Sequence, residues 1–401
     1  MKKEILFILL FLMPLSVFAQ DNEWENKLTG DWGGLRSTLS ENGIDISSQY
    51  LFAPWINLHG GANTSDSLEL QHNIQTFFDL DTKRAGLWDD GQFHLYLHGN
   101  FGRGMSGTHA PSAINMYGPD APGAGDFIQV EELWYQHTIG EIVRLRFGRI
   151  DASADFRRAN FSGGYFNDAF GPGPGSMNPF PHHPITALGV ELLLQPNDTY
   201  YVNLGLFDGQ GERDVWDTAF DGDERAYGII EGGIHLTLPI FGQDLPGTYR
   251  IGVWHDWNER QKIGGLPNSI YNNGGAGVYL ACDQMFYKEN PGDDDEQGFG
   301  AFLKLEFAPQ NRYFVDMCLG AGLRYQGLIP ERDNDFIGLG FLYADICDNL
   351  ANVSNEYGIE TFYRFQITPW FHIQPDMQFI ANPNGTGRDA LVFGIQAGLV
   401  F

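Results

Sequence analysis

The last twelve residues of the chain alternate strictly between two kinds of side chain. Over 390–401 (ALVFGIQAGLVF), every second residue from Leu391 to Phe401 is apolar, and the set between them includes the small or polar residues Gly394, Gln396 and Gly398. A period of two places the two sets on opposite faces of a β-strand. An apolar face on a strand that ends the chain with an aromatic ring suits the closing strand of a barrel whose outer wall meets lipid.

The first nineteen residues have the pattern of a secretory signal. Lys2 and Lys3 precede the apolar run 5–15, and Val17 and Ala19 place small residues before a cleavage site. The run is shorter than the roughly 20 residues that a membrane-spanning helix requires. We therefore expect residues 1–19 to be a signal peptide that is cleaved after Ala19 on export.

Composition narrows the class of the exported chain. No later segment approaches the run of about 18 apolar residues that marks a spanning helix, so a membrane-embedded form has to be a closed barrel, in which every backbone polar group has a partner. The formal net charge of −27 argues against a nucleic-acid partner, because phosphates would be repelled. The 51 glycines among 401 residues favour a turn-rich β protein.

From Ile44 onwards the chain repeats one unit, a segment of about ten residues followed by a turn or loop. These segments begin near residues 44, 68, 91, 130, 142, 185, 200, 226, 248, 276, 297, 312, 336, 354, 370 and 390. An even number of such segments is typical of bacterial outer-membrane barrels. We therefore predict an all-β fold, a transmembrane β-barrel of about 16 antiparallel strands over 44–401.

The polar faces of these segments carry charges of both signs. Lys304 and Glu306 share one face of a predicted strand, and Arg144 and Arg146 share one face of another. Charged side chains beside Gln and Gly indicate a water-filled lumen. Connections alternate between short and long until residues 286–350, where the short segment 308–312 would be external by counting, so the strand boundaries there stay open.

Residues 20–43 form a leading segment for which we predict a short periplasmic helix. Asp31 suits the N-cap, Leu35 and Leu39 lie one turn apart, and Gly43 suits a left-handed stop. Tryptophans at or near predicted strand ends are expected at the headgroup level, where amphipathic rings prefer to lie; these are Trp55, Trp134, Trp254, Trp257 and Trp370.

Several blocks of the chain resemble the OprB-type carbohydrate-selective porins. They are LTGDWGGLR (28–36) with Gly43 and Ile44, RFGR (146–149), QGFG (297–300), GLIPERDND (327–335), YRFQITPW (363–370), QPDMQ (374–378) and NPNG (382–385). The resemblance spans nearly the whole mature chain, and its first block and its 363–385 blocks are distinctive. It implies a sixteen-stranded outer-membrane barrel that passes glucose and other sugars by diffusion. It also implies arginines and carboxylates at an inner constriction.

Sugar hydroxyls suit charged hydrogen-bonding groups, and sugar ring faces suit aromatic side chains. Because a channel has to release what it holds, its contacts should be weak and spread over several sites. We predict pore-lining contacts at Arg144, Arg146, Arg149, Arg157, Arg158, Glu191, Lys304, Glu306, Arg324, Glu360 and Arg364. Arg144 and Arg146 are favoured because they form a positive patch in an acidic protein. Arg36 is expected to fix the N-terminal helix to the barrel mouth.

The long connection 151–184 leaves two interpretations open. Loops of this length are usually functional or disordered. The loop either lies inside the barrel as a constriction, or it is external and its arginines, Arg157 and Arg158, are solvated.

No pattern in the chain indicates catalysis or a bound group. A nucleophile elbow and a phosphate loop are absent, so we expect no enzyme activity and no cofactor. His182 and His183 lie between prolines without a matched partner, so no metal site is expected. Cys282, Cys318 and Cys347 are an odd number without a CxxC spacing, and their pairing stays open.

The sequence therefore predicts a carbohydrate-selective porin in the outer membrane of a Gram-negative bacterium, with sugar and outer-membrane lipid as its partners. One alternative is a secreted β-rich carbohydrate-active enzyme, which would need two carboxylates flanking a glycosidic bond. The other is a general or structural barrel without sugar selectivity. Monomer and homotrimer both stay open, because a lipid-facing wall and a subunit contact have similar compositions.

Overall fold

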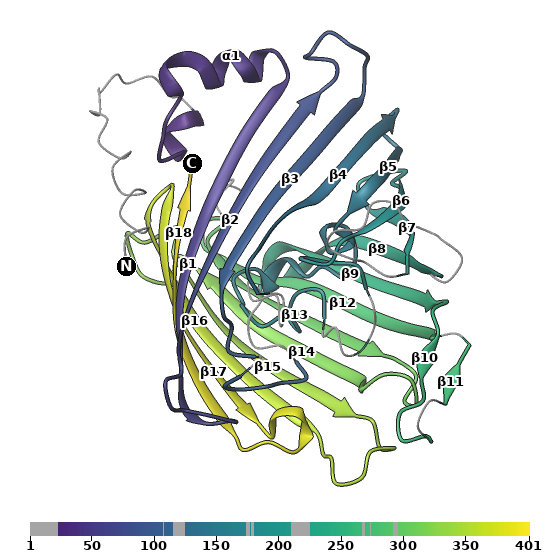
Figure 1. Cartoon of the computed structure of the whole chain (residues 1–401). Coiled ribbons are helices and arrows are strands. Elements are labelled where there is room, and N and C mark those ends of the chain that lie inside the picture. Colours follow the sequence, from purple (N-terminus) through teal and green to yellow (C-terminus); the bar gives the residue numbers. More distant parts are fainter. Residues whose placement is uncertain are drawn as a thin grey trace, which may run out of the picture.

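A closed β-barrel makes up most of the protein. The computed structural model describes residues 23–106, 108–114, 125–173, 177, 180–209, 225–266, 269–272, 274–291 and 296–401. The predicted signal peptide, 1–19, lies outside the described residues. In the described part, sixteen antiparallel strands follow one another around the barrel, and the last pairs with the first (Figure 1).

The barrel strands run in chain order around the wall. They are β1 (Ile44–Gly60), β2 (Leu68–Asp81), β3 (Gly91–Gly102), β4 (Phe127–Ile139), β5 (Val143–Ile150), β6 (Ala187–Leu194), β7 (Tyr200–Asp208), β8 (Ala226–Ile240), β9 (Gln243–Asp256), β12 (Gly275–Lys288), β13 (Gly298–Phe307), β14 (Val315–Gln326), β15 (Phe336–Ile346), β16 (Glu356–Thr368), β17 (Phe371–Ala381) and β18 (Ala390–Val400). The short strands β10 (Arg260–Gln261) and β11 (Ile270–Tyr271) pair with each other between β9 and β12.

The predicted fold class and strand number are confirmed. The strand order also settles the strand boundaries that the sequence left open over 286–350, because β13, β14 and β15 follow one another with antiparallel pairing. By this order the short connection 308–314 lies at the same rim as the long connection 151–186. The predicted closing strand is confirmed as well, since Phe52 of β1 lies opposite Ala397 of β18.

Burial alternates along the strands as the sequence predicts. In β18, Ile395 is 38% exposed on the outer face and Gln396 is 3% exposed on the inner face. In β16, Tyr357 and Ile359 are exposed, whereas Glu356 before them and Glu360 after them are buried. The outer wall is therefore apolar and the interior polar, which suits a barrel surrounded by lipid and filled with water.

Three tryptophans lie inside the barrel, so their expected position at the headgroup level is wrong. Trp55, Trp134 and Trp254 are only 1%, 8% and 2% exposed. These three tryptophans lie on the inner faces of their strands. That face, and not the distance from the strand end, decides that their rings point into the barrel.

Inward aromatic rings are accommodated by glycines on the neighbouring strand. Gly394 lies opposite Trp55, and a Cβ on it would come within 2.4 Å of the indole. Gly277 lies opposite Trp254, and a Cβ there would come within 2.2 Å of that ring. Both contacts are closer than real Cβ atoms adopt, so the high glycine content serves the inner wall as well as the turns.

The N-terminal segment is helical, but the helix begins later than predicted. Two 3-10 turns, η1 (Glu23–Asn26) and η2 (Trp32–Gly34), precede α1 (Leu35–Glu41). Gly34, rather than Asp31, is the residue before α1, with a φ of +93°. Asp31 still accepts a hydrogen bond from the backbone N–H of Ser37 at 2.7 Å. Gly43 has a φ of +82°, which confirms the predicted left-handed stop. No helix in the described part of the chain is long and apolar enough to cross a membrane.

Arg84, not Arg36, attaches α1 to the barrel. Arg36 donates to the Gly30 carbonyl at 2.7 Å and stacks on Trp32, so it holds the N-terminal segment together. Arg84, which follows β2, donates to the Ser40 carbonyl at 2.9 Å and pairs with Asp45 of β1 at 2.5 Å. The contact with the barrel mouth that the sequence assigned to Arg36 is therefore made by Arg84, in the turn between β2 and β3.

Deleting Phe401 is expected to reduce barrel assembly more than conductance. The backbone N–H of Phe401 donates to the Ser48 carbonyl at 2.7 Å, and this bond helps to close β18 against β1. The amount of folded protein in the outer membrane, measured by heat-dependent electrophoretic mobility, should fall, while conductance per inserted barrel should not change. Phe401→Tyr keeps the ring and the N–H and serves as the control. Normal membrane levels of the truncated chain would contradict this role.

Candidate functional site: a loop inside the barrel

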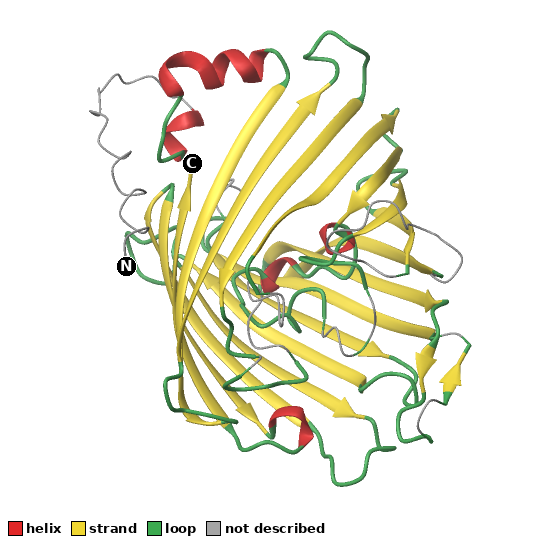
Figure 2. Ribbon diagram, in the orientation of Figure 1, coloured by secondary structure: helices red, strands yellow, loops and turns green. Residues whose placement is uncertain are grey.

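The connection between β5 and β6, residues 151–186, folds into the barrel and is called the inserted loop below. Its described residues contact β8, two strands from β6, and also β12, β13, β16 and β17, which lie farther round the barrel. Figure 2 shows green loop segments and short red helical turns within the ring of yellow strands. The interpretation of the loop as an external, solvated segment is therefore wrong.

Buried carboxylates on the wall hold the backbone of the inserted loop. Glu231 of β8, Asp283 of β12 and Glu360 of β16 each accept backbone N–H bonds from it. The donors are Arg157 N at 2.9 Å to Glu231, Phe161 N at 3.0 Å to Asp283, and Phe166 N at 2.6 Å and Asn167 N at 3.0 Å to Glu360. Each carboxyl group has two oxygens, so one side chain can accept more than one backbone N–H bond. Glu360, predicted as a pore-lining contact, therefore acts first as an anchor of the loop.

A second anchor is a buried group of opposite charges. Arg157 forms an ion pair with Glu306 of β13, and its guanidinium lies 4.9 Å from the centre of the Phe180 ring. Lys304 lies 3.9 Å from the Glu306 carboxylate and donates to the carbonyl of Gly171. The structure thus brings together three residues, Arg157, Lys304 and Glu306, that the sequence proposed separately.

Arg144 and Arg146 are neutralised by carboxylates, so the expected positive patch does not form. Both guanidiniums pair with Asp155 of the inserted loop, at 2.6 Å and 2.5 Å. Arg146 also pairs with Glu191 at 3.1 Å, and its guanidinium lies 4.4 Å from the centre of the Trp134 ring. Burial by itself would raise the pKa of Asp155, but the two arginines outweigh it and hold that pKa below its usual value.

Two further predicted arginines have different surroundings. Arg149 is buried, and its Nε donates to the Thr186 hydroxyl at 2.8 Å. Arg158 is exposed, and it donates to the Ala154 carbonyl of its own loop at 2.9 Å. The first holds the end of the inserted loop, whereas the second lies on its surface.

Arg324 of β14 and Arg364 of β16 both lie beside Phe336 of β15, where the tip of the inserted loop meets the wall. Each guanidinium carbon is 4.9 Å from the centre of the Phe336 ring. Arg324 lies 3.4 Å from the Gly163 carbonyl, and Arg364 donates to Gln374 at 2.7 Å. Both side chains are half-buried. Among the described residues, neither guanidinium has a carboxylate oxygen within 4.0 Å.

An aromatic cluster fixes the tip of the loop beside these arginines. The Tyr165 hydroxyl donates to the Leu323 carbonyl at 2.7 Å, and its ring lies 4.9 Å from that of Phe362. Gly164 has a φ of +102°, and a Cβ on it would come within 2.6 Å of the Phe336 ring and 2.9 Å of the Phe362 ring. Only glycine therefore allows the tip to lie this close to the wall.

Sequence reasoning missed several residues of this arrangement. Glu231 and Asp283 have a findable signal, because strand periodicity puts both on the inner faces of their strands. Asp155 has no such signal, since it lies in an irregular loop and meets Arg144 and Arg146 only after the loop folds back.

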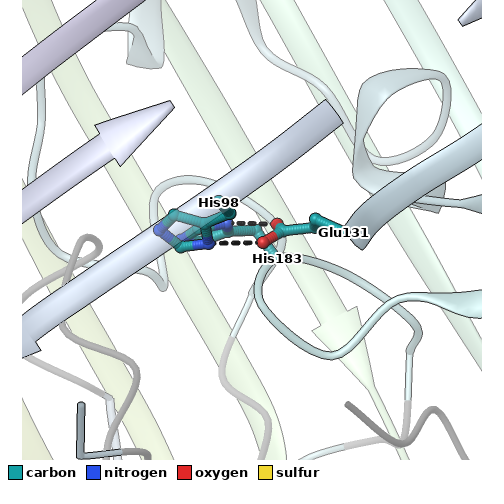
Figure 3. A group of neighbouring side chains, drawn as sticks. All are labelled: His98, Glu131 and His183. Atoms are coloured by element: carbon teal, nitrogen blue, oxygen red, sulfur yellow. Dashed lines mark hydrogen bonds and ion pairs between the residues drawn. The ribbon is translucent and has the colours of Figure 1, made fainter. Parts of the chain in front are cut away.

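His183 of the inserted loop has a carboxylate partner, which corrects the sequence interpretation of this residue. Its Nδ1 lies 2.5 Å from Oε1 of Glu131, and Nδ1 of His98 lies 2.5 Å from Oε2 of the same carboxylate (Figure 3). His98 and Glu131 are fully buried. All three cysteines are free thiols.

Comparisons with known proteins agree with this architecture. Porin B of Pseudomonas aeruginosa is 23% identical over 96% of this chain and 92% of its own length. A putative porin, QuiX, of Acinetobacter baylyi is 20% identical over 96% of this chain and 94% of its own length.

Solved structures show the same fold. The high-pH structure of Pseudomonas putida OprB has a TM-score of 0.81 at 21% identity and covers 96% of this chain and 100% of its own. The low-pH structure has a TM-score of 0.61 at 19% identity and covers 94% and 98%. The model of the carbohydrate-selective porin OprB family matches residues 66–401. This protein therefore belongs to the OprB family of carbohydrate-selective porins, outer-membrane barrels of Gram-negative bacteria.

Proposed function

We propose that this porin passes glucose-type monosaccharides and small oligosaccharides by passive diffusion, through a lumen that the inserted loop narrows. The observation that carries the proposal is the placement of Arg324 and Arg364 around Phe336 at the loop tip. Two half-buried guanidiniums without carboxylate partners within ion-pair distance, in the described part of the chain, can donate to sugar hydroxyls. The neighbouring rings offer faces to the apolar side of a sugar.

Nine of the eleven predicted site residues then divide into two roles. Seven of them form ion pairs with one another or bind the inserted loop, so they set the position of the loop. These are Arg144, Arg146, Arg157, Glu191, Lys304, Glu306 and Glu360. Arg324 and Arg364 supply the sugar contacts. A fixed loop with few directly contacting side chains suits a channel, because substrate has to be released as readily as it enters.

The family and the barrel point to a channel rather than to the alternative of a secreted enzyme. The remaining alternative, a barrel without sugar selectivity, differs from the proposal in one measurable respect. Sugars would leave its ion conductance unchanged. We further propose that residues 1–19 direct export and are cleaved after Ala19.

Replacing both tip arginines should weaken sugar binding. Arg324→Ala combined with Arg364→Ala removes charged donors, each worth about 1.5–3 kcal/mol in a hydrogen bond, so the apparent Kd for glucose should rise by about tenfold or more. The measurement is sugar-induced block of single-channel current in planar bilayers.

Arg158→Ala is the matched control, because it removes an exposed arginine from the same loop. It should leave the sugar affinity unchanged. If millimolar glucose blocked neither the wild-type protein nor any variant, the alternative of an unselective barrel would stand.

Removing the Glu360 anchor should loosen the inserted loop. Glu360→Ala takes away the acceptor of two backbone N–H bonds, so single-channel conductance should rise and its open-state fluctuations should widen. Glu360→Gln keeps one acceptor oxygen without the charge. Its conductance should lie between those of the wild-type protein and Glu360→Ala.

Glu41→Ala removes an acidic residue from the exposed end of α1 and controls for the change in net charge. The anchoring role would be refuted by Glu360→Ala channels whose conductance and fluctuations matched those of Glu41→Ala.

A further inference from the structure

We propose that His98, Glu131 and His183 form a Zn²⁺ site that fastens the end of the inserted loop to the barrel wall. This inference goes beyond the proposed transport function and does not depend on which sugar passes. The three residues come from three segments: the middle of β3, the first half of β4 and the inserted loop (Figure 3). Their ligand atoms all lie within 4.8 Å of one another.

A β-bulge places Glu131 between the two histidines. Tyr96 lies opposite Glu132 and Leu97 lies opposite Val130, so Glu131 is the extra residue of β4 at this point. Bulges re-aim side chains and are frequent beside functional sites. Here the Glu131 side chain points inward and is fully buried, with one imidazole at each oxygen.

The donor set matches zinc chemistry. Two imidazole nitrogens and one carboxylate oxygen are a common set of three protein ligands for Zn²⁺, with a fourth position left for water. Zn²⁺ bonds of about 2.0–2.2 Å require tetrahedral ligand atoms to lie about 3.3 Å apart. Because each Nδ1 is 2.5 Å from the Glu131 carboxylate, an ion needs the side chains to separate by less than about 1 Å.

Neighbouring side chains orient the ligands as they do around bound metals. Nε2 of His98 lies 2.6 Å from the side-chain amide nitrogen of Asn73, whose amide oxygen is buried without a hydrogen-bond partner among the described residues. When Nδ1 binds an ion, Nε2 carries the proton, and a half-turn of the Asn73 amide brings its oxygen round to accept it. Gln129 donates to the Glu131 carboxylate at 3.0 Å, and to the Pro184 carbonyl at 2.8 Å. Partners of this kind fix ring orientation and are worth 10- to 100-fold in metal affinity in typical sites.

An ion can reach the cluster from the side of His183. The His98 and Glu131 side chains are fully buried, whereas the His183 side chain is 24% exposed. The Glu131 carboxylate lies within hydrogen-bond distance of both imidazoles, so it supplies the negative charge that draws in a cation.

A bound ion would join β3, β4 and the inserted loop directly. The same end of the loop is already held by Thr186, whose hydroxyl donates to the Glu131 carbonyl at 2.5 Å. The metal would add a link between wall and loop that the hydrogen bonds alone supply less firmly, so zinc should stabilise the loop end.

The test is zinc binding by the whole chain, refolded in detergent and stripped of metal with a chelator. Isothermal titration with ZnCl₂ should give one ion per chain for the wild-type protein, and His183→Ala should weaken that binding by about tenfold or more. Glu131→Gln, which preserves side-chain size, should do the same and gives the answer if His183→Ala fails to fold. Heat-dependent electrophoretic mobility verifies folding of each variant.

His94→Ala is the matched control. His94 lies on the same strand and face and has a carboxylate partner, Asp79, at 2.8 Å, but it is outside the cluster. This variant should bind zinc as the wild-type protein does. Replacement of zinc by Co²⁺ should give the visible bands of a tetrahedral site without the near-ultraviolet band of thiolate ligands, which distinguishes the cluster from the free cysteines.

Two results would overturn the proposal. The first is a wild-type protein that takes up no zinc at 1:1 stoichiometry, which would leave the cluster as a hydrogen-bonded contact only. The second is zinc affinity that is the same in the wild-type protein, His183→Ala and Glu131→Gln, which would place the ion elsewhere.

Discussion

Closure of the backbone hydrogen-bond ladder is the constraint on which the rest of the structure depends. A sheet in lipid cannot leave an edge, because unpaired N–H and C=O groups have no water to bond to. Pairing of β18 with β1 removes both edges at once, and the contacts of Leu28 with Val400 and of Phe401 with Ser48 continue this seam to the rim beside α1. The apolar outer wall and the buried charges of the interior both depend on the closed ring that this seam completes.

Inside that ring, space and charge are matched by different means. Aromatic rings that point inward lie over glycines of the next strand, as Trp55 does over Gly394. Carboxylates that point inward accept the backbone N–H groups of the inserted loop, as Glu360 does. A loop inside a barrel would otherwise carry backbone N–H groups without hydrogen-bond acceptors. The acidic side chains of the wall supply those acceptors.

The excess of acid over base acquires a structural meaning here. Several carboxylates that could have been simple lumen charges are instead used up by the inserted loop, among them Glu231, Asp283 and Glu360. The arginines that looked most available from the sequence, Arg144 and Arg146, are the ones the loop neutralises through Asp155. Those that keep half-exposed guanidiniums, Arg324 and Arg364, lie where the loop tip meets the far wall.

Strand number, closure by the last strand, and the faces of Lys304, Glu306 and Glu360 were all predictable from the sequence, because a period of two is a local property that burial then enforces. The headgroup position predicted for Trp55 and Trp254 was wrong, because a position near a strand end does not determine which face of the strand the side chain is on. The partners of Arg144, Arg157 and His183 were decided only by tertiary structure. Each of these contacts involves the inserted loop, whose path depends on strands far away in the chain. No local pattern encodes where an irregular segment of that length comes to rest.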